Sequence, residues 1–245
     1  MKIFLIFILT ICALIARAQS EDNIILINVE NLDRAGIAEE ISTLSKFNPK
    51  VIAIDLQFSK RNHDAGDEEL IKALWACKNL VMTSVINDLA GNVAFSLTSQ
   101  LEFSPHGVKT GYINALQEND VHGTIKSFLV QEKEDVADKR IEYHFAVSTA
   151  MAYDSLQTAK FINTHPTVVD VDYKNGQRKF RKYSAKEVLS GKLNERDLTG
   201  KIVMIGFLGP GNEDKFYSPL NKTKKPDIYG LEYLANVVAQ ILDQK

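Results

Sequence analysis

Two short apolar runs open the chain beyond its first twenty residues. Residues 24–29 (IILINV) and 51–56 (VIAIDL) are nearly continuous in apolar character, which is typical of strands covered on both faces. Between them, apolar residues recur at spacings of four and three and predict a helix that ends before Asn48: Ile37, Ile41, Leu44 and Phe47. The pattern therefore predicts a β-α-β unit with parallel strands.

Further elements follow from the same patterns. A helix is expected over 66–77 and a strand over 80–86. The middle predicts a turn at 90–92, strands over 107–113 and 123–131, and a charged loop over 132–139. The last third predicts a helix over 144–156, a hairpin of 167–173 with 177–183 through Asn175-Gly176, a helix over 185–190, a strand over 201–207 and a helix over 228–242.

Taken together, these elements predict one α/β domain. Its sheet is mixed but mostly parallel, helices flank it, and the irregular β-rich middle is an insertion that covers it. The chain has no internal repeat and no linker rich in Pro, Gly or Ser that would divide it. The domain is expected to span residues 19–245.

The first 18 residues have the pattern of a secretory signal peptide. Lys2 precedes an apolar run over residues 3–15, and Ala16-Arg17-Ala18 supplies small residues for cleavage. The run covers 13 residues, whereas a membrane-spanning helix needs about 20. We expect cleavage after Ala18 and a soluble protein in the periplasm or secreted from the cell.

Composition and charge exclude several classes. With 45% hydrophobic and 24% charged residues, the chain is that of an ordinary globular protein. The formal net charge is −2, and cleavage would leave 27 basic and 31 acidic residues. No global positive field would draw such a protein to nucleic acid, so nucleic-acid binding is not expected. Cys77 would be the one remaining cysteine, and the helix pattern predicts that it is a buried apolar residue.

The common catalytic signatures are absent. The sequence lacks a G-x-S-x-G elbow, a phosphate-binding glycine loop, H-E-x-x-H and C-x-x-C, and its five histidines are never spaced for local metal chelation. We therefore expect no cofactor. The sequence leaves open whether there is a metal.

Candidate chemistry gathers where predicted strands end. Asp55 follows a buried strand, where α/β sheets place ligand-contacting groups, although a loop-bracing role is equally compatible. Asp67 stands where a helix begins, so a capping role competes with a site role. The loop over 206–214 joins the glycines at 206, 209 and 211 to acidic residues, including Asp214, which suits a cation, a polar ligand or a plain turn.

A basic segment precedes the last third of the chain. Consecutive charges point to both faces of a strand, so a solvated sheet edge is favoured over contact with anionic headgroups for these residues: Arg178, Lys179, Arg181 and Lys182.

Seven segments, taken in order along the chain, carry a resemblance to a known family: VIAIDLQF, DEELIKAL, GYIN, YSAKEVLSGK, LTGKIVMIG, EDKFYSPL and YGLEYLANVVAQIL. Over about residues 24–242 it resembles the CHASE domain of the second type, an extracytoplasmic sensory domain of bacterial receptors. The matching positions are Asp55, Asp67, Gly111, Asn114, Asp120, Gly123, Gly206, Asp214, Pro219, Gly230, Ala235 and Asn236. The chain departs from the family pattern at INVEN in the first strand, at Lys126 in place of arginine, and at Leu234 in place of histidine.

This resemblance implies a sensory or ligand-binding module. Because the chain ends at Lys245, directly after the last helix, we expect it to act without an output domain of its own, through a membrane-bound partner that contacts the exposed faces of that helix. The expected ligand is small and polar or cationic, held by Asp55, Asp67, Asn114, Asp120, Gly206, Asp214 and Asn236. Two alternatives stay open: a metal-assisted hydrolase that uses Asp55, Asp67 and Asp214, and a purely structural interaction domain.

The predicted cleavage site can be tested directly. Secreted material should have the intact mass of a chain that starts at Gln19. Retention of Met1 in a membrane fraction would contradict the prediction.

Overall fold

The computed structural model describes residues 20–89, 92–133, 140–173 and 178–244. Its centre is a seven-stranded sheet in the order β11-β1-β12-β2-β3-β4, with β5 beside β3. All pairs are parallel except β3 with β4. The strands are β1 (Ile24–Asn28), β2 (Val51–Ile54), β3 (Leu80–Leu89), β4 (Asn92–Leu97), β5 (Lys109–Tyr112), β11 (Arg181–Ser184) and β12 (Ile202–Gly206).

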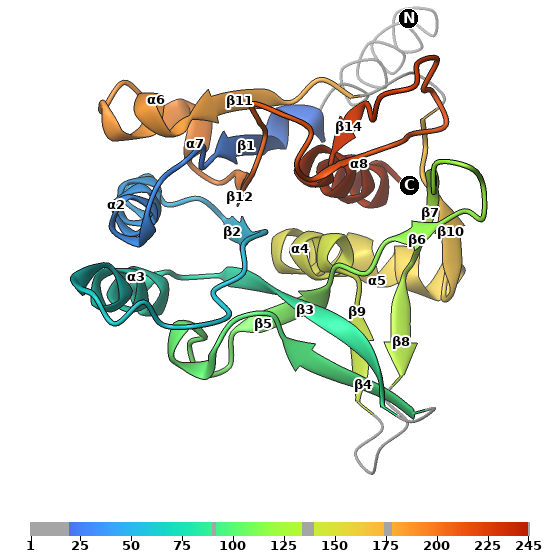
Figure 1. The fold of residues 1–245 in the computed structure, drawn as a ribbon, viewed down its shortest axis with the longest axis horizontal. Coiled ribbons are helices and arrows are strands. Elements are labelled where there is room, and N and C mark those ends of the chain that lie inside the picture. Colours follow the sequence, from blue (N-terminus) through green and yellow to red (C-terminus); the bar gives the residue numbers. More distant parts are fainter. Residues whose placement is uncertain (1–19, 90–91, 134–139, 174–177, 245) are drawn as a thin grey trace, which may run out of the picture.

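Helices cover both faces of this sheet (Figure 1). One face carries α2 (Arg34–Ser45), α3 (Ala65–Ala76), α6 (Ala185–Leu189) and α7 (Glu195–Leu198). The other carries α4 (Phe145–Tyr153), α5 (Ser155–Thr164) and α8 (Gly230–Asp243). The predicted α/β fold with a mostly parallel sheet and flanking helices is thereby confirmed.

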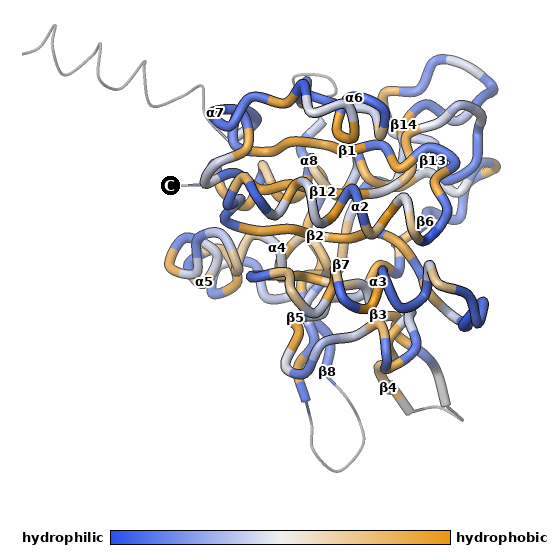
Figure 2. Tube along the Cα trace, turned by 90° about the vertical axis from the view of Figure 1, so that its left-hand side faces the viewer, coloured by the Kyte–Doolittle hydropathy of each residue, from blue (hydrophilic) through white to orange (hydrophobic). Residues whose placement is uncertain are grey.

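Alternate residues of the central strands fill two separate cores. Ile24 and Leu26 of β1 pack with Leu231 of α8, whereas Ile25 and Ile27 pack toward Ile41 of α2 and its neighbours. Figure 2 shows the resulting continuous apolar colouring along β1, β12 and β2. Because successive strand residues point to opposite faces, a continuous apolar run is what a sheet covered on both faces requires.

Small sheets outside the central one cover the α4 side. One has the order β10-β7-β6, a second pairs β8 with β9, and a third pairs β13 with β14. Ile125 and Phe128 of β7 enter the same core as α4 and α8. The elements are β6 (Leu116–Gln117), β7 (Ile125–Leu129), β8 (Gln131–Lys133), β9 (Ile141–Tyr143), β10 (Val168–Asp170), β13 (Lys215–Phe216), β14 (Ile228–Tyr229), and the 3-10 helices η1 (Glu21–Asn23) and η2 (Leu101–Phe103).

The predicted hairpin around Asn175-Gly176 is wrong. β10 pairs antiparallel with β7, whereas β11 pairs parallel with β1, so the two strands belong to different sheets. The turn itself, like the predicted turn residues 90–91 and loop residues 134–139, lies outside the described residues. Local turn chemistry favoured a hairpin, but main-chain pairing with β1 placed the largely exposed strand β11 at the edge of the central sheet.

The single helix predicted over 144–156 is two helices. α4 ends at Tyr153, and Asp154 caps α5 by accepting a hydrogen bond from the Gln157 backbone N–H (3.0 Å). An aspartate at this position satisfies a free donor of the second helix, which explains the break. Sequence analysis did not predict α5.

Two smaller expectations are met to different degrees. Cys77 follows the last residue of α3 and is only half-buried, so the helix pattern overstated its burial. Burial still raises the pKa of its thiol.

β11 is an edge strand of the central sheet, as the basic segment predicted, and its charges are paired: Arg181 with Asp197 and Lys182 with Glu232.

Glu40 of α2 is a buried acid. It has no exposed surface, and neither of its carboxylate oxygens has a hydrogen-bond partner among the described residues. Burial, and secondarily the charge of Glu30, raise the pKa of Glu40 to about 8. Near neutral pH the folded protein therefore holds this residue in its neutral form.

Replacing Glu40 by glutamine should stabilise the protein. In the unfolded chain Glu40 ionises near its ordinary pKa, so wild type loses stability as pH rises from about 4.5 to about 8, and Glu40→Gln does not. At pH 7 we expect a gain of about 1–3 kcal/mol in the free energy of unfolding, measured by urea denaturation at several pH values. The exposed neighbour Glu39→Gln is the control and should change little. Equal pH profiles for wild type and Glu40→Gln would contradict this.

Candidate functional site

Three parallel strands end side by side at one edge of the central sheet. Asn28 ends β1, Gly206 ends β12, and Asp55 follows β2. The backbone N–H of Asp55 donates to the carbonyl of Ile205 (2.8 Å), and that of Val29 donates to the carbonyl of Gly206 (3.1 Å). The chain then leaves β1 and β2 for α2 and α3 on one face, whereas it leaves β12 for α8 on the other. Such a reversal at the carboxyl ends of parallel strands is where α/β sheets bind ligands.

Gly206 lets Asp55 approach this edge closely. A Cβ atom at position 206 would lie 3.4 Å from both Cβ and the carbonyl oxygen of Asp55, and 3.2 Å from Cδ1 of Leu231. A Cβ at 206 would therefore fill the space beside Asp55 and would require a small shift of the Leu231 side chain.

The side chain of Asn28 fixes the loop that follows β12. Its Oδ1 accepts hydrogen bonds from the backbone N–H groups of Leu208 (2.9 Å) and Glu30 (3.2 Å), and its Nδ2 donates to the carbonyl of Gly209 (3.2 Å). Sequence analysis missed Asn28. Its position at the end of a buried strand was the signal that could have identified it.

Asp214 ends the same loop and lies against the start of α8. Its carbonyl accepts a hydrogen bond from the Gly230 N–H (2.8 Å), and its φ angle is +58°. A Cβ at position 230 would lie 2.8 Å from Oδ2 of Asp214, so only glycine leaves room for this carboxylate. The side chain of Asp214 therefore rests on the first residue of α8.

Asp55 and Asp214 form a pair of carboxylates without neutralising partners. Burial, and secondarily the charge of Asp214, raise the pKa of Asp55 to about 7, and burial raises the pKa of Asp214 to about 6. Among the described residues, none donates a hydrogen bond to either side chain or forms an ion pair with it. We call Asp55, Gly206 and Asp214, with Asn28, the sheet-edge site. Its carboxylate oxygens can accept hydrogen bonds from a ligand, and the pKa values of its two acids are close to neutral pH.

An aromatic residue borders the sheet-edge site. Nζ of Lys215 lies 4.4 Å from the ring centroid of Tyr229, the residue before α8. The ring of Phe207 makes a T-shaped contact with the same ring, with centroids 6.3 Å apart. The Tyr229 hydroxyl donates to the carbonyl of Gly211 (3.2 Å). Lys215, which follows Asp214, is thus held by the ring of Tyr229. Sequence analysis had identified neither residue.

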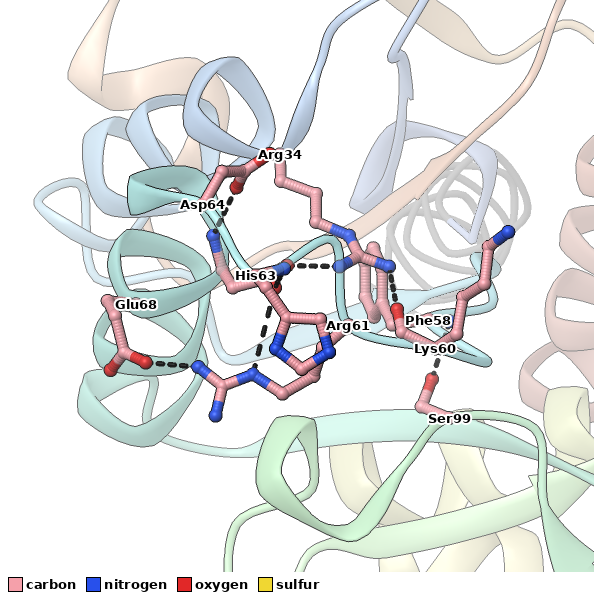
Figure 3. Close-up of polar contacts among 9 residues, drawn as sticks. Arg34, Phe58, Lys60, Arg61, His63, Asp64, Glu68 and Ser99 are labelled. Atoms are coloured by element: carbon pink, nitrogen blue, oxygen red, sulfur yellow. Dashed lines mark hydrogen bonds and ion pairs between the residues drawn. The ribbon is translucent and has the colours of Figure 1, made fainter.

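Asp67 is engaged in a different network, drawn in Figure 3 around the loop between β2 and α3. Its side chain is fully buried, forms an ion pair with Arg34 and accepts a hydrogen bond from the His63 N–H (2.7 Å). Burial opposes its ionisation, but these bonds prevail and lower its pKa. Arg34 also donates to the carbonyl of Lys60 and lies over the ring of Phe103, so Asp67 holds the loop in place.

The other candidate residues brace backbone. Asn114 exchanges two hydrogen bonds with the backbone of Ile86, at 2.7 and 3.1 Å. Asp120 accepts from Thr124 and from the His122 N–H, and its pKa is lowered to about 2. Asn236 is buried in α8, where it donates to the carbonyl of Glu232 (2.9 Å) and accepts from the Arg178 N–H (3.4 Å). Of the seven candidates, the structure places Asp55, Gly206 and Asp214 together.

Two general properties bear on the chemistry of the protein. Within the residues that the structure describes, no three His, Cys, Asp or Glu side chains are grouped so that they could hold a metal ion. In the same part of the chain, no helix has both the length and the apolar character needed to cross a membrane.

Comparison with known families gives one match. A family model described as CHASE2 domain matches residues 17–245. No curated protein and no solved structure matches the chain significantly.

The Asp67 network should make stability sensitive to acid. Because the pKa of Asp67 is lowered in the folded protein, its stabilising contribution is present above the unfolded pKa and is lost as pH falls through the folded one. Asp67→Asn should therefore lower the melting temperature at pH 7 by several degrees, with the difference shrinking toward pH 3. Asp64→Asn, which keeps an N-cap acceptor, is the control. A difference from wild type that did not depend on pH would contradict this role.

Proposed function

We propose that this chain, which belongs to the CHASE2 domain family of extracytoplasmic sensory domains, is a sensory module. It binds a small ligand at the sheet-edge site. The ligand is a cation or a molecule that bears amine or hydroxyl groups. Binding occurs without turnover, and the signal passes to a membrane-bound partner.

The unpaired carboxylates of Asp55 and Asp214 carry this proposal. Asp55 is half-buried and Asp214 is exposed. Burial raises both pKa values, and the charge of Asp214 raises that of Asp55 further, so ionisation of these acids is penalised while no counter-charge is present. A cation or a donor group placed between them removes that penalty and gains charge-assisted hydrogen bonds. Phosphate at this site is disfavoured, because the same charges would repel it.

The surroundings also favour binding over catalysis. The sheet-edge site presents no pair of nucleophile and base side chains, and the third acid of the hydrolase alternative, Asp67, is bound to Arg34. With Asp67 absent from the site, we assign the two aspartates a ligand-binding role, and the turnover assay below tests this assignment against catalysis.

α8 offers a route for the signal. The carboxylate of Asp214 rests on Gly230, the first residue of α8, so a ligand that moves Asp214 acts directly on the helix. The helix is buried along most of its length, and its exposed surface lies mainly near its end, at Asp243. A partner would therefore contact the end of α8. A shift of the helix would reach the partner through that end rather than through a broad exposed face.

The double variant Asp55→Asn/Asp214→Asn tests the site. In a calorimetric screen of divalent metal ions, amines and polyols, wild type should bind a member of the panel at least about tenfold more tightly at pH 8 than at pH 5, because both acids are ionised only above about pH 7. The double variant should lose this binding. Glu213→Gln, which removes one charge from the same loop, should retain it.

Two outcomes would contradict the proposal. Turnover in an esterase and phosphatase panel that is lost in the double variant would make the protein an enzyme. Identical ligand profiles for wild type and double variant would leave the structural interaction domain.

The single variant Asp55→Asn should be more thermally stable than wild type at pH 8, which distinguishes loss of binding from loss of fold.

A further inference from the structure

A second site lies away from the sheet edge. A pocket of about 360 Å³ opens between the turn at residues 120–124 and the segment 217–223. The backbone N–H of Ile125 donates to the carbonyl of Tyr217 (2.9 Å) and joins the two walls. The lining residues are His122, Thr124, Lys126, Tyr217, Ser218, Pro219, Asn221 and Thr223.

Apart from Pro219, the lining residues have side chains that can donate hydrogen bonds, and none of them is acidic. Lys126 is about half exposed, and its ammonium has only a long contact, 3.6 Å, to the carboxylate of Glu118. The ring of His122 stacks on that of Tyr217, with centroids 4.4 Å apart and planes within 16°. Together they supply a charged donor beside a flat aromatic wall.

Three more lysines lie within or directly after the segment 217–223. Lys222, Lys224 and Lys225 are exposed, and among the described residues none is paired with an acidic side chain. We call these three, with Lys126, the basic cluster. The protein as a whole carries a net charge of −2, so this concentration of positive charge is local. Like charges this close in sequence repel one another, and an anion relieves that repulsion.

The loop that carries the basic cluster is held in a defined shape. Asp227 accepts hydrogen bonds from the N–H (2.9 Å) and Oγ (2.6 Å) of Ser218 and from Nδ2 of Asn221 (2.8 Å). Oδ1 of Asn221 in turn accepts from the Thr223 N–H (2.6 Å), and the Tyr217 hydroxyl donates to the carbonyl of Lys224 (3.1 Å). A loop fixed in this way loses little conformational entropy when a ligand binds.

We propose that the pocket binds a phosphate group through Lys126 and the neighbouring lysines. Lysine is a point-charge donor suited to the several equivalent oxygens of phosphate. The pocket is as large as those that hold small organic ligands, so it accepts a phosphomonoester as well as the bare ion. A soluble phosphomonoester and the phosphodiester of an anionic lipid headgroup both present anionic phosphate oxygens to these lysines. The site does not depend on the sheet-edge site.

The test uses the full mature chain and two variants. One is Lys126→Gln, and the other combines Lys222→Gln, Lys224→Gln and Lys225→Gln. The control is Lys160→Gln, an exposed lysine of α5. The probes are inorganic phosphate, glycerol 3-phosphate, and vesicles of phosphatidylglycerol with phosphatidylcholine vesicles as reference. Binding is measured at low ionic strength by calorimetry and by vesicle flotation, and melting temperatures confirm folding.

Wild type should bind glycerol 3-phosphate saturably, and each site variant should weaken binding at least about fivefold, as expected for loss of a charge-assisted contact, while the control does not. Flotation only with phosphatidylglycerol, competed by glycerol 3-phosphate, identifies a lipid headgroup as the source, and absence of flotation identifies a soluble ester. Absence of saturable binding to every probe overturns the proposal, as does equal weakening in Lys160→Gln. The double variant of the sheet-edge site should keep full phosphate binding, so the two proposals fail separately.

Discussion

The position of β12 between β1 and β2 is the constraint on which the rest of the structure depends. Ile202 lies in register with Ile24 on one side and with Val51 on the other, so three parallel strands with apolar residues on both faces begin and end together. Each must be covered on both sides. Because the chain reaches β2 from one face and leaves β12 toward the other, the strand ends open between two helical layers. The sheet-edge site follows from this topology.

Asp67 and the two acids of the sheet-edge site have different surroundings. Asp67 is surrounded by donors from Arg34 and the backbone, and its charge stabilises the β2–α3 loop. Asp55 and Asp214 lack such partners, and their raised pKa values mean that ionisation costs stability. Asp67 thus has the surroundings of a structural acid, whereas Asp55 and Asp214 have those on which the proposed ligand site is based.

Sequence patterns predicted what depends on local periodicity. The continuous runs of β1, β2 and β12 identified strands covered on both faces, and the place of Asp55 after such a strand led to the site. What they missed depends on long-range pairing. Nothing local indicates that Arg181 lies beside Ile25, or that Asn28 meets the Leu208 backbone. Sequence analysis did not identify Glu40, which packing of the helix leaves without exposed surface.

The two proposed sites share one covalent connection. The chain leaves Asp214 along β13, forms the segment with the basic cluster, and returns along β14 to Gly230, where the Gly230 N–H bonds back to the Asp214 carbonyl. β13 and β14 pair through only two residues each, so this connection is short. The sheet-edge site and the basic loop are thus anchored on the same short pair of strands, but they use different side chains: Asp214 rests on Gly230 of α8, whereas Lys126 belongs to β7. Each site can therefore be altered without removing a contact of the other.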